Sequence, residues 1–292
     1  MSAAIEKAYV TIAEGQLHLR QRAGASDVAA DGLPLALLHA SPASSRTLEP
    51  LMAALGPKRW LLAFDTPCNG QSCVPAVPAP AMADFADMIA RGADALGTDA
   101  LGTDALGAEP LALYGTHTGA HIAIEWALAH PDRVRALVLD GVALLDEAMR
   151  AEFLERYAPP QVPDESGAQF QWAWSFIRDQ MIFFPHYRKD AEHIRPGGTL
   201  DPQVLHELVL DVLSNLTHYH LPYEAVFRHD VRAALAQLAV PTLVLGDAES
   251  ALGPATESIA AMVPGAQIAL GCDSPAAKAR AIETFLKEHT GG

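Results

Sequence analysis

The amino-acid sequence predicts an α/β protein in which a mostly parallel sheet is covered by helices on both faces. Two observations predict this fold class. Short, continuous apolar runs recur along the chain, as expected for strands that are buried on both sides. Stretches with helical periodicity separate these runs, and such alternation indicates parallel strands joined by helices. The predicted buried strands are residues 33–38, 60–65, 111–115, 135–145, 242–247 and 266–271.

The remaining predicted elements complete this α/β pattern. Residues 8–22 alternate around Gly15, which predicts a β-hairpin ahead of the first buried strand. Residues 95–107 repeat a five-residue unit and are interpreted as a duplication that lengthens a surface helix or loop. Helices are expected at residues 47–55, 82–96, 116–130 and 275–289.

The stretch from residue 146 to residue 235 differs from the rest of the chain. It contains helical runs broken by prolines and glycines, and no strand pattern. We therefore expect a core formed by residues 1–145 and 236–292, with residues 146–235 inserted after the sixth strand as a helical lid.

Composition and charge limit the classes of partner. The 292 residues include 20 basic and 35 acidic side chains, a net charge of −15, so a nucleic-acid partner is not expected. No apolar run approaches the roughly 18 residues of a membrane span. The three cysteines, Cys68, Cys73 and Cys272, suggest no disulfide framework, which favours the reducing cytoplasm.

Five segments, taken in order, carry a resemblance to a known family. They are LLHASPASS (37–45), FDTPCNGQS (64–72), the stretch that opens with LYGTHTG (113–119), VPTLVLGDAES (240–250) and ALGCDSP (269–275). In order and spacing they resemble the oxyanion-hole stretch, the turn after the next strand, the nucleophile elbow, the acid loop and the base loop of the α/β-hydrolase family. The resemblance implies an α/β-hydrolase fold with a site at the carboxyl ends of the strands.

Two positions depart from that family's pattern. The middle residue of the elbow, where the family has serine, is His117, and the position of the family's catalytic histidine holds Cys272. An ordinary Ser–His–Asp mechanism is therefore excluded. Three carboxylates remain as candidate partners of the imidazole: Asp247, Glu249 at the expected spacing, and Asp140.

Four roles of His117 are compatible with the sequence. The favoured role is a general base or acid, kept neutral by the helix N-terminus, with the backbone N–H groups of Ser41 and Thr118 as an oxyanion hole. In a swapped dyad, Cys272 is the nucleophile and His117 its base. As a third role, His117 is itself the covalent nucleophile. In the last, catalysis is lost and the pocket only binds a ligand.

Further side chains are expected to line the pocket. They are His39, Thr116, Trp172, Trp174, His218 and Tyr219. The aromatic residues among them suggest an aromatic or otherwise apolar substrate of modest size. His39 is expected to hold loop structure rather than act on substrate, and Asp65 to fix its own turn. Arg178 and Arg188 are interpreted as surface residues rather than as carboxylate ligands.

The sequence thus predicts a hydrolase-like enzyme that acts on a small carbonyl or acyl compound without an organic cofactor. No metal site is expected, because the two imidazoles of His218 and His220 would point apart on a helix. The alternatives are a lyase, decarboxylase or isomerase that uses the same oxyanion hole, and a ligand-binding homologue. The expected partner is a small molecule, with no nucleic acid and no membrane; a homo-oligomer is compatible with the sequence.

Overall fold

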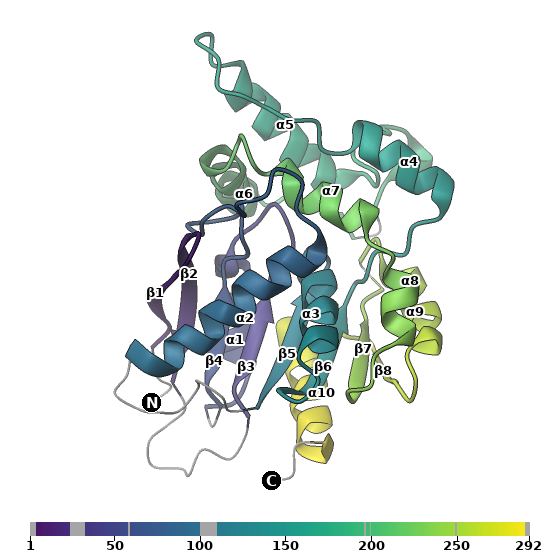
Figure 1. The fold of residues 1–292 in the computed structure, drawn as a ribbon. Helices are drawn as coiled ribbons and strands as arrows, with labels where there is room; N and C mark the ends of the chain where they lie inside the picture. The colour runs from purple at the N-terminus through teal and green to yellow at the C-terminus, as the bar shows by residue number, and fades with distance from the viewer. Residues whose placement is uncertain are drawn as a thin grey trace.

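A computed structural model describes residues 4–23, 33–57, 59–99, 110–195, 197–198, 200–248 and 250–289. Within these residues the centre of the fold is a sheet of eight strands in the order β1-β2-β4-β3-β5-β6-β7-β8 (Figure 1). The strands are β1 (Glu6–Ile12), β2 (Gly15–Arg22), β3 (Leu35–Leu38), β4 (Leu61–Phe64), β5 (Leu111–Thr116), β6 (Val134–Asp140), β7 (Thr242–Gly246) and β8 (Gln267–Leu270).

The strand directions agree with the sequence pattern. The predicted hairpin is confirmed: β1 pairs antiparallel with β2, and Ile12 lies opposite Gly15 at its turn. β2 is also antiparallel to β4, whereas the pairs from β4 through β8 are all parallel. The runs that form β3, β4 and β7 are buried along their whole length, because helices cover both of their faces.

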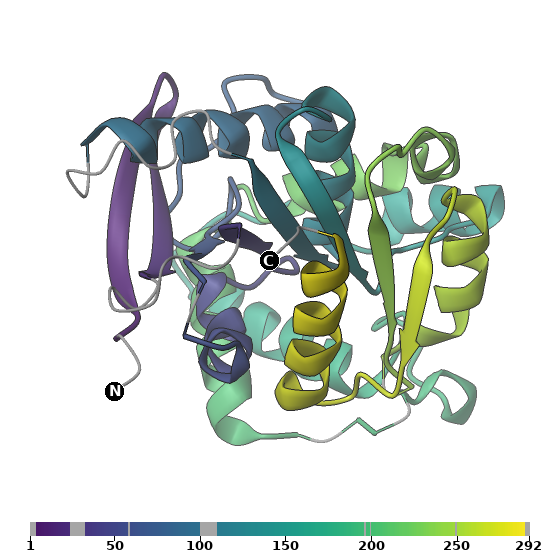
Figure 2. The same ribbon diagram turned by 90° about the horizontal axis from the view of Figure 1, so that it is seen from below.

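Helices cover the two faces of the sheet in separate layers. On one face lie α1 (Glu49–Ala54) and α10 (Pro275–His289), which pack on each other (Figure 2). On the other face lie α2 (Met82–Asp99), α3 (Thr118–Ala129), α8 (Val231–Ala236) and α9 (Thr256–Met262). Each layer encloses its own cluster of buried apolar side chains. The prediction of an α/β sheet flanked by helices is therefore confirmed.

The chain between β6 and β7 is helical. It forms α4 (Glu147–Arg156), α5 (Ala168–Ile182), α6 (Pro202–Ser214) and α7 (His220–Arg228) ahead of α8. The first four of these helices lie above the carboxyl ends of the central strands, whereas α8 packs on α3 and α9 beside the sheet (Figure 1). The only pairing of strand type in the described part of residues 141–241 is an isolated bridge between Phe183 and Ile194. Short 3-10 helices occupy Ser45–Leu48, Ala191–His193 and Gly253–Ala255.

Two predicted boundaries are wrong. The sixth strand was expected to reach residue 145, but β6 ends at Asp140 because Gly141, with φ +72°, turns the chain away from the sheet. The helix expected at 82–96 continues to Asp99. The part of the five-residue repeat from residue 100 to residue 107 lies outside the described residues.

Asp65, directly after β4, connects strand β2 with two other segments of the chain. Its carboxylate accepts hydrogen bonds from the backbone N–H of Ser45 at 2.7 Å, from that of Gln71 at 2.9 Å and from His18 Nδ1 at 2.8 Å. Burial alone would raise the pKa of Asp65, but these hydrogen bonds outweigh it and hold that pKa well below its usual range. The expected role of Asp65 in fixing its turn agrees with this geometry. In the described part of the chain, no helix combines the length and hydrophobicity that crossing a membrane requires.

Candidate active site

The turn from β5 into α3 carries His117 in a strained conformation. His117 has φ 50° and ψ −114°, which is unusual for a residue with a Cβ. The turn is tight because strand and helix pack without intervening side chains. A Cβ on Gly119 would lie closer than 3.0 Å to the carbonyl oxygen of Leu38, and one on Gly115 would clash with the backbone of Gly119. This strand-to-helix turn, with His117 at its tip, is called the elbow below.

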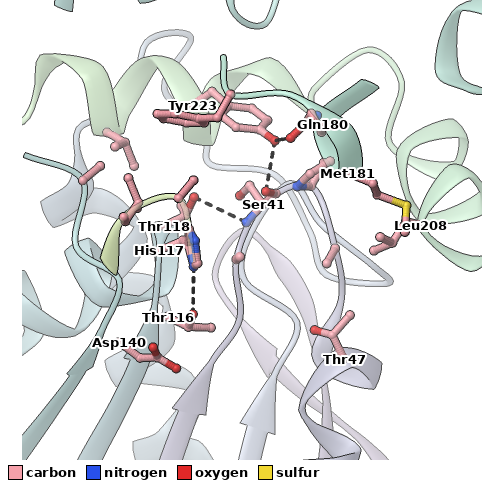
Figure 3. A pocket seen from close by; sticks show the side chains of 18 of the residues that line it. Ser41, Thr47, Thr116, His117, Thr118, Asp140, Gln180, Met181, Leu208 and Tyr223 are labelled. Atoms are coloured by element: carbon pink, nitrogen blue, oxygen red, sulfur yellow. Dashed lines mark hydrogen bonds between the residues drawn. The ribbon is translucent and has the colours of Figure 1, made fainter. Parts of the chain in front are cut away.

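The tip of the elbow borders a cavity of about 510 Å³ between the sheet and the overlying helices. Its lining includes His117, Thr116, Thr118, Ser41 and Asp140, all of which come from the carboxyl ends of strands or the loops that follow them (Figure 3). Much of the remaining wall is apolar and includes Leu48, Leu145, Ile177, Leu208, Val226 and Phe227. The site therefore lies where the strand ends predict it.

A chain of hydroxyl groups, rather than a carboxylate, holds the imidazole of His117. The Nδ1 atom lies 2.9 Å from Thr116 Oγ1 (Figure 3). The Thr116 hydroxyl also hydrogen-bonds Tyr114, whose phenol donates to Asp140 Oδ2 at 2.6 Å. Lys278 donates to the same carboxylate oxygen at 2.8 Å and lies 3.5 Å from Asp247 Oδ2.

One tautomer of His117, with its proton on Nδ1, matches the direction of this chain. The chain runs from His117 through Thr116 and Tyr114 to Asp140. Because Asp140 can only accept, each of the two hydroxyls can donate toward Asp140 and accept a hydrogen bond from the side of His117. Nδ1–H of His117 then donates to Thr116, which donates to Tyr114. Nε2, which has no hydrogen-bond partner among the described residues, is left as a lone-pair acceptor. The ring is therefore arranged to accept a proton at the nitrogen that Thr116 does not hold.

The surroundings of His117 favour the neutral ring. Burial lowers its pKa most, and the positive charges of Arg195 and Lys278 lower it further. The carboxylates of Asp140 and Asp247 act in the opposite direction but do not reverse the shift. The pKa of His117 therefore lies below its usual value, and the ring is an uncharged base at pH 7.

The two backbone groups expected to form the oxyanion hole lie beside the ring. Thr118 is the first residue of α3, so its N–H has no intrahelical acceptor. The N–H of Ser41 points to Thr118 Oγ1 at a long 3.3 Å (Figure 3). Tyr223 of α7 donates its phenolic hydrogen to the carbonyl of Ser41 at 3.0 Å, which connects this loop to the helices above.

Cys272 does not occupy the place that a swapped dyad requires. Its thiol donates to the carbonyl of Ala269 at 3.4 Å, and the side chain is buried in the apolar cluster beneath α10. It is absent from the cavity lining. The chain turns at Gly271, with φ +70°, directly ahead of the cysteine. The geometry therefore contradicts Cys272 as a nucleophile.

His39 and three of the four lid residues chosen for the pocket have other partners. His39 Nδ1 donates to the carbonyl of Ala40, and its Nε2 accepts from the N–H of Thr66, so it holds two loops together as expected. Trp172 stacks on Phe176, and the hydroxyl of Tyr219 donates to the carbonyl of Pro159. His218 contacts the Thr217 hydroxyl.

Placing these residues in the pocket is therefore wrong. None of His39, Trp172, Trp174, His218 and Tyr219 belongs to the cavity lining, and Trp174 is 40% exposed. Trp172 and Trp174 lie in the first half of α5, whereas the α5 residues that line the cavity lie in its second half. Of the expected lining residues, Thr116 is correctly placed.

The carboxylates expected to partner His117 have different positions. Asp140 lines the cavity but reaches the imidazole through Tyr114 and Thr116, and Asp247 lies near Lys278. Glu249 lies outside the described residues. No three His, Cys, Asp or Glu side chains converge as metal ligands within the described ranges, and the absence of a metal stays a prediction.

Sequence reasoning missed several polar residues of the cavity, among them Tyr114, Arg195 and Lys278. Tyr114 was visible as the residue two positions ahead of Thr116 on the same face of the strand. Lys278 and Arg195 carry no local signal, because they reach the site only when α10 and the end of α5 pack over it. His121, one turn after His117, pairs with His229 Nδ1 at 2.9 Å and lies in the interface with α7.

Comparison with known proteins identifies the fold. The family model of the α/β hydrolase fold matches residues 34–177. No curated protein matches the sequence at a significant level. The structure is similar to a hydrolase from Pseudomonas aeruginosa PA01, with 22% identity, a TM-score of 0.68, and 98% of this chain and 99% of that chain covered.

Two further solved structures are similar over nearly the whole chain. A thermophilic esterase from Thermogutta terrifontis shares 21% identity with a TM-score of 0.62, covering 98% of this chain and 100% of that chain. A bromoperoxidase from Bacillus anthracis shares 17% identity with a TM-score of 0.68, covering 97% of this chain and 100% of that chain. The chain has an α/β-hydrolase fold.

Proposed function

We propose that this protein is a hydrolase-like enzyme that cleaves a small acyl compound with His117 as a general base. The observation that carries the proposal is the orientation of the imidazole. Nδ1 is held by Thr116, while Nε2 has no protein partner among the described residues and the ring borders an apolar cavity. A neutral imidazole fixed in one tautomer beside a substrate-sized cavity is arranged for proton transfer.

The reaction begins with a water molecule next to Nε2. The nitrogen takes a proton from the water as its oxygen attacks the acyl carbon, and negative charge develops on the carbonyl oxygen. The N–H groups of Thr118 and Ser41 stabilise that oxygen once the Thr118 hydroxyl turns away from Ser41. The imidazolium then returns the proton to the leaving group as the bond to the acyl carbon breaks.

The hydroxyl chain assists while the imidazolium exists. Positive charge on the ring strengthens the hydrogen bond from Nδ1 to Thr116, and the chain through Tyr114 ends at the Asp140 carboxylate. The mechanism needs neither an activated serine nor an organic cofactor. The helices α4 to α7 act as a lid that limits the access of bulk water to the cavity.

The solved structures named above support the reaction class, because two of them are a hydrolase and an esterase on the same fold. The same base and oxyanion site would also serve for removing a proton from carbon, as in a lyase or isomerase. Hydrolysis is preferred because Nε2, the oxyanion donors and the cavity can accommodate both an acyl group and a water.

A fluorophosphonate probe tests the proposal. It labels activated serines, whereas the cavity serines here are not activated: Ser41 Oγ accepts from Asn69, and Ser274 Oγ accepts from the N–H of Ala277. We expect turnover of short-chain nitrophenyl esters to persist in the presence of the probe, with no increase in protein mass. A stoichiometric adduct on a serine, together with lost turnover, would show that the mechanism is wrong.

A further inference from the structure

Arg195, in the chain that follows α5, presents a cation to the cavity. Its backbone N–H donates to the carbonyl of Ile182 at 2.8 Å, and its Nη1 donates to the carbonyl of Gln180 at 2.8 Å. The Phe183–Ile194 bridge fixes the same segment. Arg195 is thus anchored to the end of α5 at two points, and it belongs to the cavity lining.

The guanidinium of Arg195 has no carboxylate partner among the residues that the structure describes. Arg178 and Arg188, which the sequence analysis interprets as surface residues rather than as carboxylate ligands, are paired with Asp179 and Glu152, respectively. Nε of Arg195 is buried without a hydrogen-bond partner. In a chain with a net charge of −15, an inward-facing cation left without a carboxylate is unexpected.

The other charges of the cavity do not neutralise Arg195. They are Asp140, Lys278 and Asp273. Lys278 and Asp140 neutralise each other at 2.8 Å, and Asp273 is exposed and forms no ion pair with a described residue. Among the residues that the structure describes, no carboxylate therefore compensates the positive charge that Arg195 supplies to this largely apolar space.

A second polar group faces the same space. Tyr157 lines the cavity, and its hydroxyl has no hydrogen-bond partner among the described residues. Arg195, Tyr157 and His117 all line this cavity. Burial raises the pKa of Tyr157, and the charge of Arg195 acts against that rise. The same charge lowers the pKa of His117 further below the value that burial gives it.

We propose that Arg195 and the Tyr157 hydroxyl bind a carboxylate of the substrate, so that the enzyme prefers acyl compounds that carry a second, anionic end. This proposal rests on the proposed function, because it takes the cavity next to His117 as the place of acyl transfer. An arginine can donate two parallel hydrogen bonds to a carboxylate, and a phenol can add a third. The apolar wall accommodates the hydrocarbon that separates the two ends.

A matched pair of esters tests the proposal. Mono-4-nitrophenyl adipate carries a free carboxylate, and methyl 4-nitrophenyl adipate has the same chain with that carboxylate masked. We expect the wild-type protein to prefer the anionic ester in kcat/KM. Arg195→Gln should lower the ratio of the two kcat/KM values by about 10- to 100-fold, mainly by raising KM for the anionic ester.

Further variants separate binding from structural damage. Arg195→Lys keeps the positive charge but cannot donate two parallel hydrogen bonds as a guanidinium does. The ratio of the two kcat/KM values should therefore fall less than in Arg195→Gln. Tyr157→Phe should lower it a few-fold through the loss of about one hydrogen bond. Arg178→Gln, which removes a surface arginine already paired with Asp179, should leave the ratio unchanged. Equal ratios in the wild type, Arg195→Gln and Arg195→Lys would overturn the inference.

Titration calorimetry with adipate alone measures binding of the carboxylate without any hydrolysis. It therefore tests the anion site separately from the proposed function. Binding of adipate that is lost in Arg195→Gln supports the anion site even where no ester is hydrolysed. Hydrolysis of the neutral ester that depends on His117, without Arg195-dependent binding of adipate, supports the proposed function and rejects the anion site.

Discussion

His117→Asn is expected to lower kcat/KM for ester hydrolysis by about 10²- to 10⁴-fold, the usual contribution of a general base. Asparagine is chosen because it tolerates a positive φ better than most residues, so the elbow, with φ 50°, can keep its shape. Its amide cannot take the proton that the imidazole takes. The loss should appear mainly in kcat, because the cavity walls that bind the substrate are unchanged.

The matched control for this substitution is Cys272→Ala. The thiol points at the carbonyl of Ala269 and away from the cavity, so kcat/KM should stay within about 2-fold of the wild-type value. Thermal unfolding of both variants shows whether each is folded. Equal decreases in kcat/KM in His117→Asn and Cys272→Ala would support the swapped dyad. An unchanged kcat/KM in His117→Asn would show that the residue at the elbow takes no part in the reaction.

Gly119→Ala is expected to lower the free energy of unfolding by about 3 kcal/mol or more, because the added Cβ overlaps fixed backbone. It would lie closer than 3.0 Å to the carbonyl oxygens of Leu38 and His39. Helix propensity predicts the opposite sign, since alanine is favoured over glycine in a helix by up to about 1 kcal/mol. Urea denaturation measures which effect is larger.

Gly56→Ala is the matched control for that experiment. A Cβ at Gly56 meets only the flexible carboxylate of Glu283, at 3.8 Å. The unfolding free energy of this variant should change by no more than about 0.5 kcal/mol. A similarly small change in Gly119→Ala would mean that α3 does not pack directly on β3.

The fold and the elbow were predictable from sequence because their signals are local. The buried strands are continuous apolar runs, and the Gly115-Thr116-His117-Thr118-Gly119 segment contains both the glycines and the tip residue of the elbow. Each feature is determined within a few residues, so neither depends on how distant segments meet. The same holds for Asp65, whose position after a buried strand predicts its role in the turn.

The polar partners of His117 depend on tertiary packing and could not be predicted in the same way. Lys278 reaches Asp140 because α10 packs under β6, and Arg195 reaches the cavity because its segment pairs with the end of α5. Cys272 shows the converse: it is at the expected sequence position, but its side chain is buried in the apolar cluster beneath α10 and does not line the cavity.

The aromatic residues of α5 were misplaced for a related reason. The residues of α5 that line the cavity are Ile177, Gln180 and Met181, all in the second half of the helix. Trp174 lies one turn earlier, beyond the cavity. Sequence periodicity gives the face of a helix and not the point along it where a cavity ends.

The pH dependence of kcat/KM tests the central claim most directly, namely that neutral His117 is the base. Its pKa is lowered by burial, below the usual value of about 6.5, and a base works only when unprotonated. With the neutral methyl ester as substrate, we expect kcat/KM to be constant from about pH 7 to pH 8. It should fall on the acid side with a midpoint below about 6.5, and this acid limb should be absent from the residual activity of His117→Asn. A midpoint above pH 7, or the same acid limb in His117→Asn, would contradict the account.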